Sequence, residues 1–197
     1  MSRGGPDIAV LELEPGNDIA AAQLATNISV AVMDLLPPKV GDNVAAFGFH
    51  RTTVQLSAGV EETLVQWHVD SATTTGVVTE VFPFGHGERL PWPCFQTNAQ
   101  TRHSMSGGPV FNSAGRVCGL VCDSLKEAED AEDYVSWMVS LWPAVGIVLA
   151  GWRPNRISYT LLDAIRAGEA SARNSDRVSI KTDANGEQQV SFLSLGT

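Results

Sequence analysis

The sequence predicts an all-β fold, because its middle is rich in β-branched and aromatic residues broken by turn-forming residues. Three stretches carry this signal: Asn43–Phe49, Thr63–Phe82 and Gly108–Val121. Glycine, proline and the run Asn-Ser-Ala-Gly interrupt them. Several short strands at this spacing are typical of a β-sandwich or β-barrel.

Two β-hairpins are expected. The first is FNSAGRV, residues 111–117, where apolar arms flank a short loop and Gly115 is able to adopt a positive φ. The second is the tail VSIKTDANGEQQVSFLSL, residues 178–195, which would turn around Ala184-Asn185-Gly186.

Helix is expected only near the C-terminus, in SYTLLDAIRAGEASA, residues 158–172. Leu161, Leu162 and Ile165 are at helical spacing there, with Ser158 as the predicted N-cap and Gly168 near the end.

Composition excludes some function classes. The formal net charge of −9 leaves no cationic surface to displace counterions from phosphates, so nucleic acid is not expected as a partner. No run of 18 apolar residues is present, and the first residues lack the pattern of a signal peptide, so we expect no membrane partner and a cytoplasmic location.

The three cysteines fit poorly with a secreted disulfide framework. Cys118 and Cys122 would share a strand and lie about 13 Å apart, which is beyond the span of a disulfide. Buried thiols explain them better than a metal site with His103, and we expect no metal and no cofactor.

The stretch Ser106-Gly107-Gly108-Pro109 is the strongest chemical signal. A serine nucleophile needs a sharply turned backbone, so that its oxygen projects and nearby N–H groups converge on the oxyanion. Glycines directly after the serine permit that turn without a side-chain clash. Alone the motif also fits an ordinary loop, because Ser-Gly pairs are common in turns.

The context resembles the trypsin-like (chymotrypsin-fold) serine proteases, most closely their HtrA-like bacterial branch. The resemblance rests on QTNAQTRHSMSGGPVFNSAGRVCGLV (Gln96–Val121), DIAVLEL (Asp7–Leu13), KVGDNVAAFGF (Lys39–Phe49) and TTGVVTEVF (Thr74–Phe82). It spans Asp7 to Leu149 and implies a chymotrypsin-like double β-barrel, its first barrel incomplete, followed by a C-terminal helix and hairpin. The expected segments are a first-barrel remnant with the linker (1–38), the second barrel (39–152) and the tail (153–197).

The resemblance also implies roles. Ser106 would be the nucleophile and Asp7 the carboxylate that orients the catalytic imidazole, while the N–H groups of Ser104 and Ser106 would form the oxyanion hole. Gln100 would lie at the base of a neutral specificity pocket.

The strand Tyr134–Met138, with Ser136 and Trp137, would bind an extended peptide by β-augmentation. Ser136 would either donate a hydrogen bond to Asp7 or face solvent.

Two features depart from the family pattern. Ser104 stands where the family has glycine, at a peptide that must turn its N–H into the oxyanion hole. The triad histidine should precede Asp7, yet His50, His68, His86 and His103 all follow it.

Three explanations stay open for the missing histidine and the missing first-barrel strands. The chain is a fragment or a mis-started reading frame, or a degenerate and inactive descendant, or a binding module whose tail hairpin covers the edge of the Asp7 strand.

The predicted function is a serine-type endopeptidase domain that hydrolyses polypeptides through an acyl-serine intermediate and is inactive as written, because its general base is missing. The alternative is a non-catalytic, protease-like module that binds an extended peptide or a partner protein.

Overall fold

A computed structural model describes residues 8–11, 16–27, 29–58, 63–126, 134–149, 159–184 and 188–193. The chain divides into two compact units, which are treated separately. The first, here called the barrel unit, is Pro37–Ser140. The second, here called the terminal unit, combines Gly4–Leu36 with Leu141–Thr197. The structure thus divides the chain at Pro37 and after Ser140, whereas the sequence predicted boundaries after residues 38 and 152.

The barrel unit is a closed six-stranded β-barrel. Its strands are β2 (Asn43–Ala58), β3 (Thr63–Phe82), β4 (Cys94–Thr97), β5 (Pro109–Asn112), β6 (Val117–Lys126) and β7 (Tyr134–Ser140). They run in the order β5-β2-β3-β4-β7-β6, and pairing of β5 with β6 closes the cylinder. The all-β prediction is confirmed, and the three predicted strand regions coincide with β2, β3 and the β5–β6 hairpin.

Alternating side chains fill the barrel interior. Val44 and Ala46 from β2, Val78 from β3, Phe95 from β4 and Met138 from β7 belong to one buried cluster. Since successive residues of a strand point to opposite faces, the other half of each strand faces outward.

The predicted hairpin at residues 111–117 is confirmed. Gly115 has φ +69° and donates its N–H to the Asn112 carbonyl at 2.9 Å. The Asn112 side chain accepts hydrogen bonds from the N–H groups of Ala114 and Arg116, at 3.0 and 3.1 Å. Asparagine before this loop therefore supplies a local acceptor, while glycine supplies the left-handed backbone.

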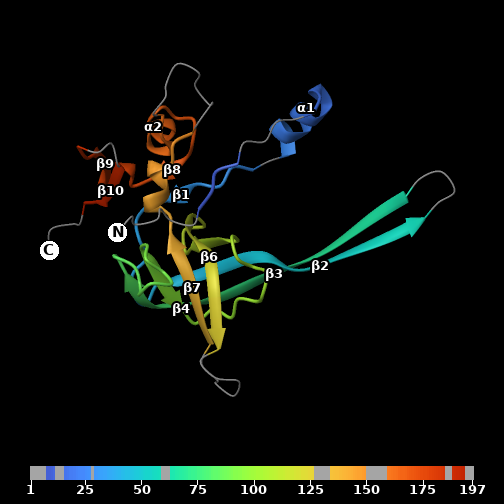
Figure 1. Cartoon of the computed structure of the whole chain (residues 1–197), viewed down its shortest axis with the longest axis horizontal. Coiled ribbons are helices and arrows are strands. Elements are labelled where there is room, and N and C mark those ends of the chain that lie inside the picture. Colours follow the sequence, from blue (N-terminus) through green and yellow to red (C-terminus); the bar gives the residue numbers. More distant parts are fainter. Residues whose placement is uncertain are drawn as a thin grey trace. The chain divides into compact units, whose positions relative to one another are not determined.

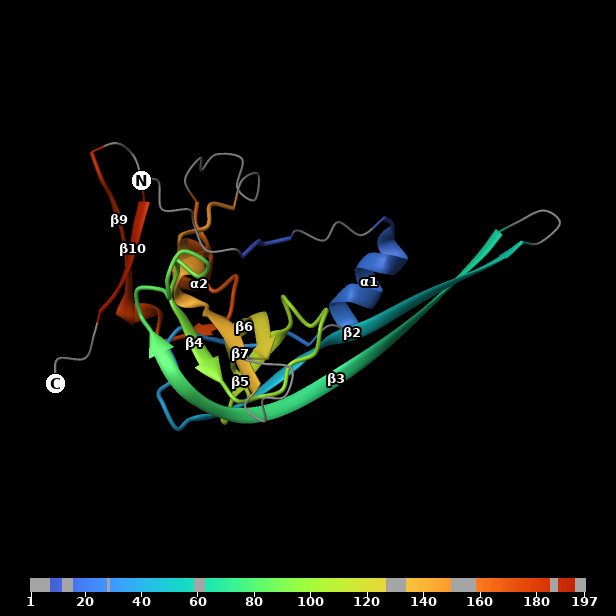
Figure 2. The ribbon, with the colours of Figure 1, turned by 60° about the horizontal axis from the view of Figure 1, so that its bottom comes forward.

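Strands β2 and β3 form a two-stranded arm that extends beyond the barrel (Figures 1 and 2). A β-bulge at His50 separates the barrel part of β2 from the arm, because Phe49 pairs with Ser71 while Arg51 pairs with Asp70. Beyond the bulge the two strands stay in register from Arg51 to Ala58.

The terminal unit contains α1 (Asp18–Asn27), β1 (Met33–Asp34), the 3₁₀ turns η1 (Trp142–Gly146) and η2 (Ser175–Arg177), α2 (Leu161–Arg166), β8 (Ala172–Arg173), β9 (Val178–Thr182) and β10 (Gln188–Phe192). β1 pairs with β8 in parallel. The buried Asp34 accepts a hydrogen bond from the Asn174 side chain at 2.6 Å, which ties the segment before the barrel to the tail.

Several sequence predictions for the terminal unit need correction. Helix α1 was not predicted, since its alanine-rich run has no clear apolar face. Helix α2 is confirmed, but its N-cap is Thr160, which forms a capping box with Asp163. The predicted cap Ser158 lies outside the described residues, and residues 8–11 of the expected Asp7 strand form no regular secondary structure.

The predicted tail hairpin is confirmed as the antiparallel pair β9–β10. It is a two-stranded sheet of its own, so it does not extend a strand at residues 8–11. Within the described ranges no helix is long and apolar enough to cross a membrane.

Candidate active site

Ser106 lies at the surface, on a loop that is anchored in the barrel on both sides. Its neighbour Met105 is 1% exposed and belongs to the barrel core. Ser106 itself is exposed, and the N–H of Gly107 donates to the Val121 carbonyl at 2.7 Å. Burial of one side chain thus turns the next one out to solvent.

The two glycines after Ser106 have different physical roles. Gly107 has φ +85°, a backbone conformation that L side chains rarely adopt. Gly108 packs directly on β2, since a Cβ there would lie 2.1 Å from the Phe47 carbonyl oxygen. The first glycine permits the turn, and the second allows the loop to lie on the barrel wall.

A second anchor holds the residues that precede the turn. Ser136 on β7 is fully buried and donates its hydroxyl proton to the Ala99 carbonyl at 2.7 Å. Its oxygen lies 2.6 Å from the Thr101 hydroxyl and accepts the Thr101 N–H at 3.3 Å. Because the serine proton is already used, Thr101 is the donor in the hydroxyl pair.

This geometry changes the interpretation of Ser136. The residue does not face solvent, and its single proton is committed to Ala99, so donation to Asp7 would have to break this bond. Asp7 lies outside the described residues. The structure therefore makes Ser136 a residue that positions the segment before the Ser106 turn.

Strand β7 is paired on both edges over part of its length. Cys94–Thr97 of β4 pair with Ser136–Val139 on one side, and β6 pairs with Tyr134–Ser140 on the other. Binding of an extended peptide along Tyr134–Met138 by β-augmentation stays a prediction; at Ser136–Met138 it would have to displace β4, because that mode requires a free strand edge.

The backbone conformation of Ser104 gives the physical reason why glycine is expected at its position. Its φ is +71°, and the Met105 N–H donates to the Arg102 carbonyl at 3.2 Å, so residues 102–105 form a tight turn. A positive φ at the third residue of such a turn favours glycine. Among the described residues, the N–H groups of Ser104 and Ser106 donate to no protein acceptor.

The Ser106 hydroxyl donates to the main-chain oxygen of Cys122 at 3.1 Å. None of the four histidines is its partner. Arg102 donates to His50 at 3.2 Å, His68 contacts Asp70 at 3.0 Å, and the His86 ring stacks on Trp137 at 4.7 Å, while His103 is exposed. None of these hydrogen bonds therefore joins the Ser106 hydroxyl to a base that would take its proton.

Trp137 lines a pocket of about 300 Å³ on the outer face of β6 and β7. Its ring packs against Phe82 and His86, and Leu90 contributes to the apolar lining. An ion pair between Arg89 and Asp123 lies at this pocket. Asp123 directly follows Cys122, so the pocket begins beside the carbonyl that holds Ser106. Gln100, in contrast, is exposed.

Cys94 is 1% exposed and belongs to the same buried cluster as Leu90 and Trp137. Burial, together with the nearby Cys122 thiol, raises the pKa of Cys94 from 9.0 to about 11. The thiol is thus a neutral packing group, as the sequence suggested. The three cysteines are free, and the described part of the chain contains no cluster of three or more His, Cys, Asp or Glu side chains that would hold a metal ion.

Besides the bonds of Ser136, sequence reasoning missed two groups that position Ser106 from outside the motif. One is the buried side chain of Met105. An apolar residue between two serines is the alternating pattern that predicts a buried residue between two exposed ones. The other is the Cys122 carbonyl, a backbone group that carries no side-chain signal.

A surface serine at a glycine turn on a closed six-stranded barrel is the arrangement expected of the trypsin-like class. The model of the trypsin-like peptidase domain matches residues 2–120, and the chain belongs to this family. Uncharacterized protein y4bJ of Sinorhizobium fredii is 26% identical over 116 residues, which are 59% of this chain and 16% of that protein.

Solved proteases are similar at lower identity. A variant of the HtrA-type protease AlgW with decapeptide is 14% identical, with a TM-score of 0.44; the match covers 79% of this chain and 38% of the AlgW chain. Rv3671c from M. tuberculosis H37Rv, in an inactive mutant form, is 18% identical, with a TM-score of 0.35; the match covers 56% of this chain and 47% of the Rv3671c chain. The chain spans less than half the length of each of these proteins.

Proposed function

We propose that this chain carries the nucleophile of a serine-type endopeptidase, and that it turns over peptides slowly because it does not supply the general base. The observation that carries the proposal is the exposed Ser106 at the Gly107 turn, with its hydroxyl held by Cys122 and two N–H groups beside it. Acyl transfer to serine requires a projecting hydroxyl with N–H donors close to it, and these features support the proposal.

In the proposed reaction the Ser106 oxygen attacks the peptide carbonyl carbon while its proton passes to a base. The N–H groups of Ser104 and Ser106 stabilise the oxyanion, and the C–N bond then breaks as the amine leaves with a proton. Water next attacks the acyl-serine, which releases the acid and restores the hydroxyl. Asp7 would orient the base, and no metal or cofactor takes part.

The hydrogen bond from the Ser106 hydroxyl to the Cys122 carbonyl explains why we expect slow turnover. A proton donated to the Cys122 carbonyl is not being transferred to a base, because a carbonyl oxygen is too weakly basic to remove it. Loss of a triad member leaves only residual catalysis from binding and the oxyanion hole.

The substrate would be a polypeptide, and the pocket at Trp137 would receive one of its apolar side chains. The pocket is apolar at Leu90 and Trp137, and it lies one residue from the carbonyl that holds Ser106. Since ligand pockets are mostly apolar with few polar groups, this lining favours an aliphatic or aromatic side chain.

The alternative is a protease-like module that binds a peptide or partner without cleaving it. The strained backbone at Ser104 favours it, because a peptide that relaxes by flipping would remove one N–H from the oxyanion hole. Removal of one such donor costs about 10²–10³ in turnover.

A fluorophosphonate probe tests the proposal, because it reacts only with an activated serine. We expect slow labelling of the 197-residue chain, none in Ser106→Ala, and fast labelling of an N-terminally longer form that carries an upstream histidine. Fast labelling of the 197-residue chain would contradict the missing base. No labelling in the longer form would favour the binding module.

A further inference from the structure

The arm formed by β2 and β3 has one apolar face and one polar face. Antiparallel partners lie on the same face of a sheet, and the faces alternate along the strands. The pairs Arg51–Asp70 and Thr53–His68 therefore share one face, whereas Thr52–Val69 and Val54–Trp67 share the other.

The apolar face of the arm is continuous with the outer wall of the barrel. Every second residue of β3 lies on the same face as Trp67 and Val69, and none of these residues lies in the barrel core: Ser71, Thr73, Thr75 and Val77. On β2 the extra residue at the His50 bulge compensates for the change of pairing, so Phe47 and Phe49 lie on the same face as Thr52 and Val54. We call this surface the outer strip; it runs from the pair Asn43–Val77 to the pair Val54–Trp67.

The outer strip contains no charged residue in any of its cross-strand pairs. The charges of this ribbon lie on the opposite face, at Arg51 and Asp70. The strip nevertheless exposes large apolar groups: Trp67 is 69% exposed and Phe49 is 54% exposed. A charge-free surface of this kind in a chain of net charge −9 is the feature that needs an explanation.

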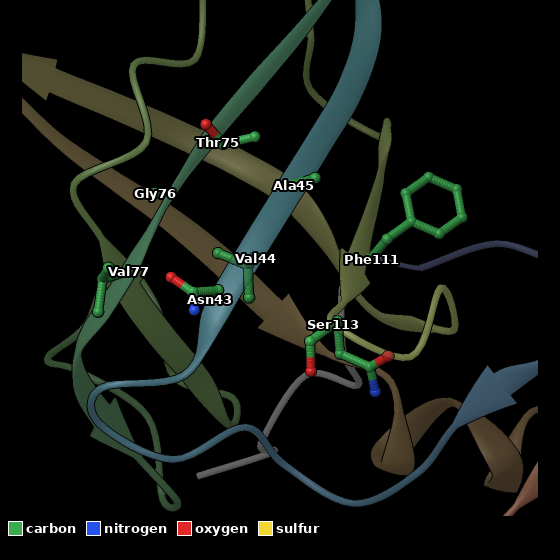
Figure 3. Close-up of a pocket in the computed structure, with 9 residues that line it drawn as sticks. Asn43, Val44, Ala45, Thr75, Gly76, Val77, Phe111 and Ser113 are labelled. Atoms are coloured by element: carbon green, nitrogen blue, oxygen red, sulfur yellow. The ribbon is translucent and has the colours of Figure 1, made fainter.

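The two ends of the strip differ in shape. At the arm end the Trp67 ring projects. At the barrel end, β2, β3 and β5 form an open pocket of about 490 Å³ that is lined by Ala45, Thr75 and Phe111 among others (Figure 3). Phe111 pairs with Ala45, and Ala45 pairs with Thr75, so all three lie on the outer face.

We propose that the outer strip is a homodimer interface, in which two copies pack strip against strip in opposite directions. A two-fold axis at Ser71 places Trp67 of one copy over Thr75 of the other, because both are four residues from Ser71. Each tryptophan then enters the pocket of the other copy, and the interface is closed and self-complementary.

The size and chemistry of the strip fit a second copy. The four aromatic residues Phe47, Phe49, Trp67 and Phe111 and their neighbours provide on the order of 800 Å² per copy, which is what each partner buries in an interface of standard size. Two acidic chains repel each other in general, and a surface without charge is where they approach at the least electrostatic cost. Packing also covers a two-stranded ribbon that is only marginally stable alone.

Sedimentation equilibrium of the 197-residue chain tests the proposal. We expect a mass near twice 21.0 kDa at micromolar concentration, and a dissociation constant at least 100-fold higher for Trp67→Glu. Gln66→Glu adds the same charge to the neighbouring residue on the polar face, and it should leave the dimer intact. A monomeric wild-type chain, which would mean that the strip serves another partner, overturns the proposal, and so does a Trp67→Glu variant that stays dimeric.

The pocket end is tested separately. Thr75→Glu should weaken the dimer as Trp67→Glu does, whereas Thr53→Glu on the polar face should not. Circular dichroism and the melting temperature establish that each variant is folded. If Thr75→Glu dimerises as tightly as the wild type, the antiparallel arrangement is wrong.

Discussion

The hydroxyl of Ser136 donates to the main-chain oxygen of Ala99 at 2.7 Å, and through this bond the barrel wall fixes the loop that presents Ser106. The Ser136 oxygen in turn accepts from the Thr101 hydroxyl at 2.6 Å and, more weakly, from the Thr101 N–H at 3.3 Å, and that N–H also donates to the Ala99 carbonyl at 2.9 Å. One buried serine therefore adds hydrogen bonds to both ends of the turn from Ala99 to Thr101.

Ser136→Ala should destabilise the protein. The variant removes the bonds of the Ser136 hydroxyl to the Ala99 carbonyl and to the Thr101 hydroxyl, whereas the Thr101 N–H keeps its bond to the Ala99 carbonyl at 2.9 Å. Each buried hydrogen bond contributes about 0.5–1.5 kcal/mol, so we expect a loss of about 1–3 kcal/mol in urea unfolding. Ser140→Ala is the matched control, since it removes a buried hydroxyl from the same strand that has no side-chain hydrogen bond among the described residues. Equal losses in the two variants would show that the Ala99–Thr101 bonds contribute nothing.

Gly108→Ala should be more damaging than its position in a loop suggests. The new Cβ would lie 2.1 Å from the Phe47 carbonyl oxygen and 2.9 Å from that of Met105, both of which are backbone atoms. Forced overpacking of this kind costs about 1–3 kcal/mol or more.

The control for Gly108 is Gly115→Ala. That site has φ +69° and no atom within 4 Å of an added Cβ, so only the backbone strain of about 1–2 kcal/mol applies. Thermal unfolding of both variants separates the clash from the strain. A Gly108→Ala protein as stable as Gly115→Ala would mean that the loop does not lie against β2.

Ser104→Gly should stabilise the chain. Ser104 has φ +71°, and glycine adopts this conformation without the penalty of about 1–2 kcal/mol that an L side chain carries. Part of the gain is offset by the greater freedom of glycine in the unfolded chain, so a net increase of about 0.5–1 kcal/mol is expected.

Ser113→Gly provides the comparison for Ser104. Ser113 is equally exposed and has no positive φ, so glycine there should leave stability unchanged or lower it. Urea midpoints measure both variants. A loss of stability in Ser104→Gly would show that the turn at residues 102–105 does not hold the left-handed conformation.

The sequence predicted those parts of the fold that repeat a local pattern. Alternating β-branched residues located β3 from Thr63 to Phe82, and Asn112 with Gly115 located the first hairpin. The closure of six strands into a barrel came from the resemblance, because pairing of β5 with β6 is a non-local fact that no short window contains.

The surface turn that carries Ser106 could be predicted from the chain, because Gly107 and Gly108 mark it, whereas the role of Ser106 as nucleophile stays a prediction. The preference for glycine at position 104 came from the resemblance, and the positive φ of Ser104 gives its physical reason. The hydrogen bonds of Ser136 could not be predicted, because they depend on which strands lie on either side of β7. A strand with both edges paired has the same sequence pattern as one with a free edge.

The pH dependence of stability should reveal the burial of Cys94. Burial, with Cys122 nearby, raises its pKa to about 11, whereas an exposed thiol has a pKa of 9.0. Below pH 9 both the folded and the unfolded chain keep the proton, and the contribution to stability is complete. Between pH 9 and 11 the unfolded chain loses the proton while the folded chain retains it, so stability falls as the pH rises.

Cys94→Ala isolates this effect from the lysines and tyrosines that titrate in the same range. The variant should be less stable than the wild type at pH 8, because it loses a buried side chain, and the difference should shrink steadily between pH 9 and 11. Urea unfolding at five or six pH values in this interval measures it. If the difference stays constant across the interval, the thiol ionises alike in both states, and Cys94 cannot lie in the apolar environment beneath Trp137.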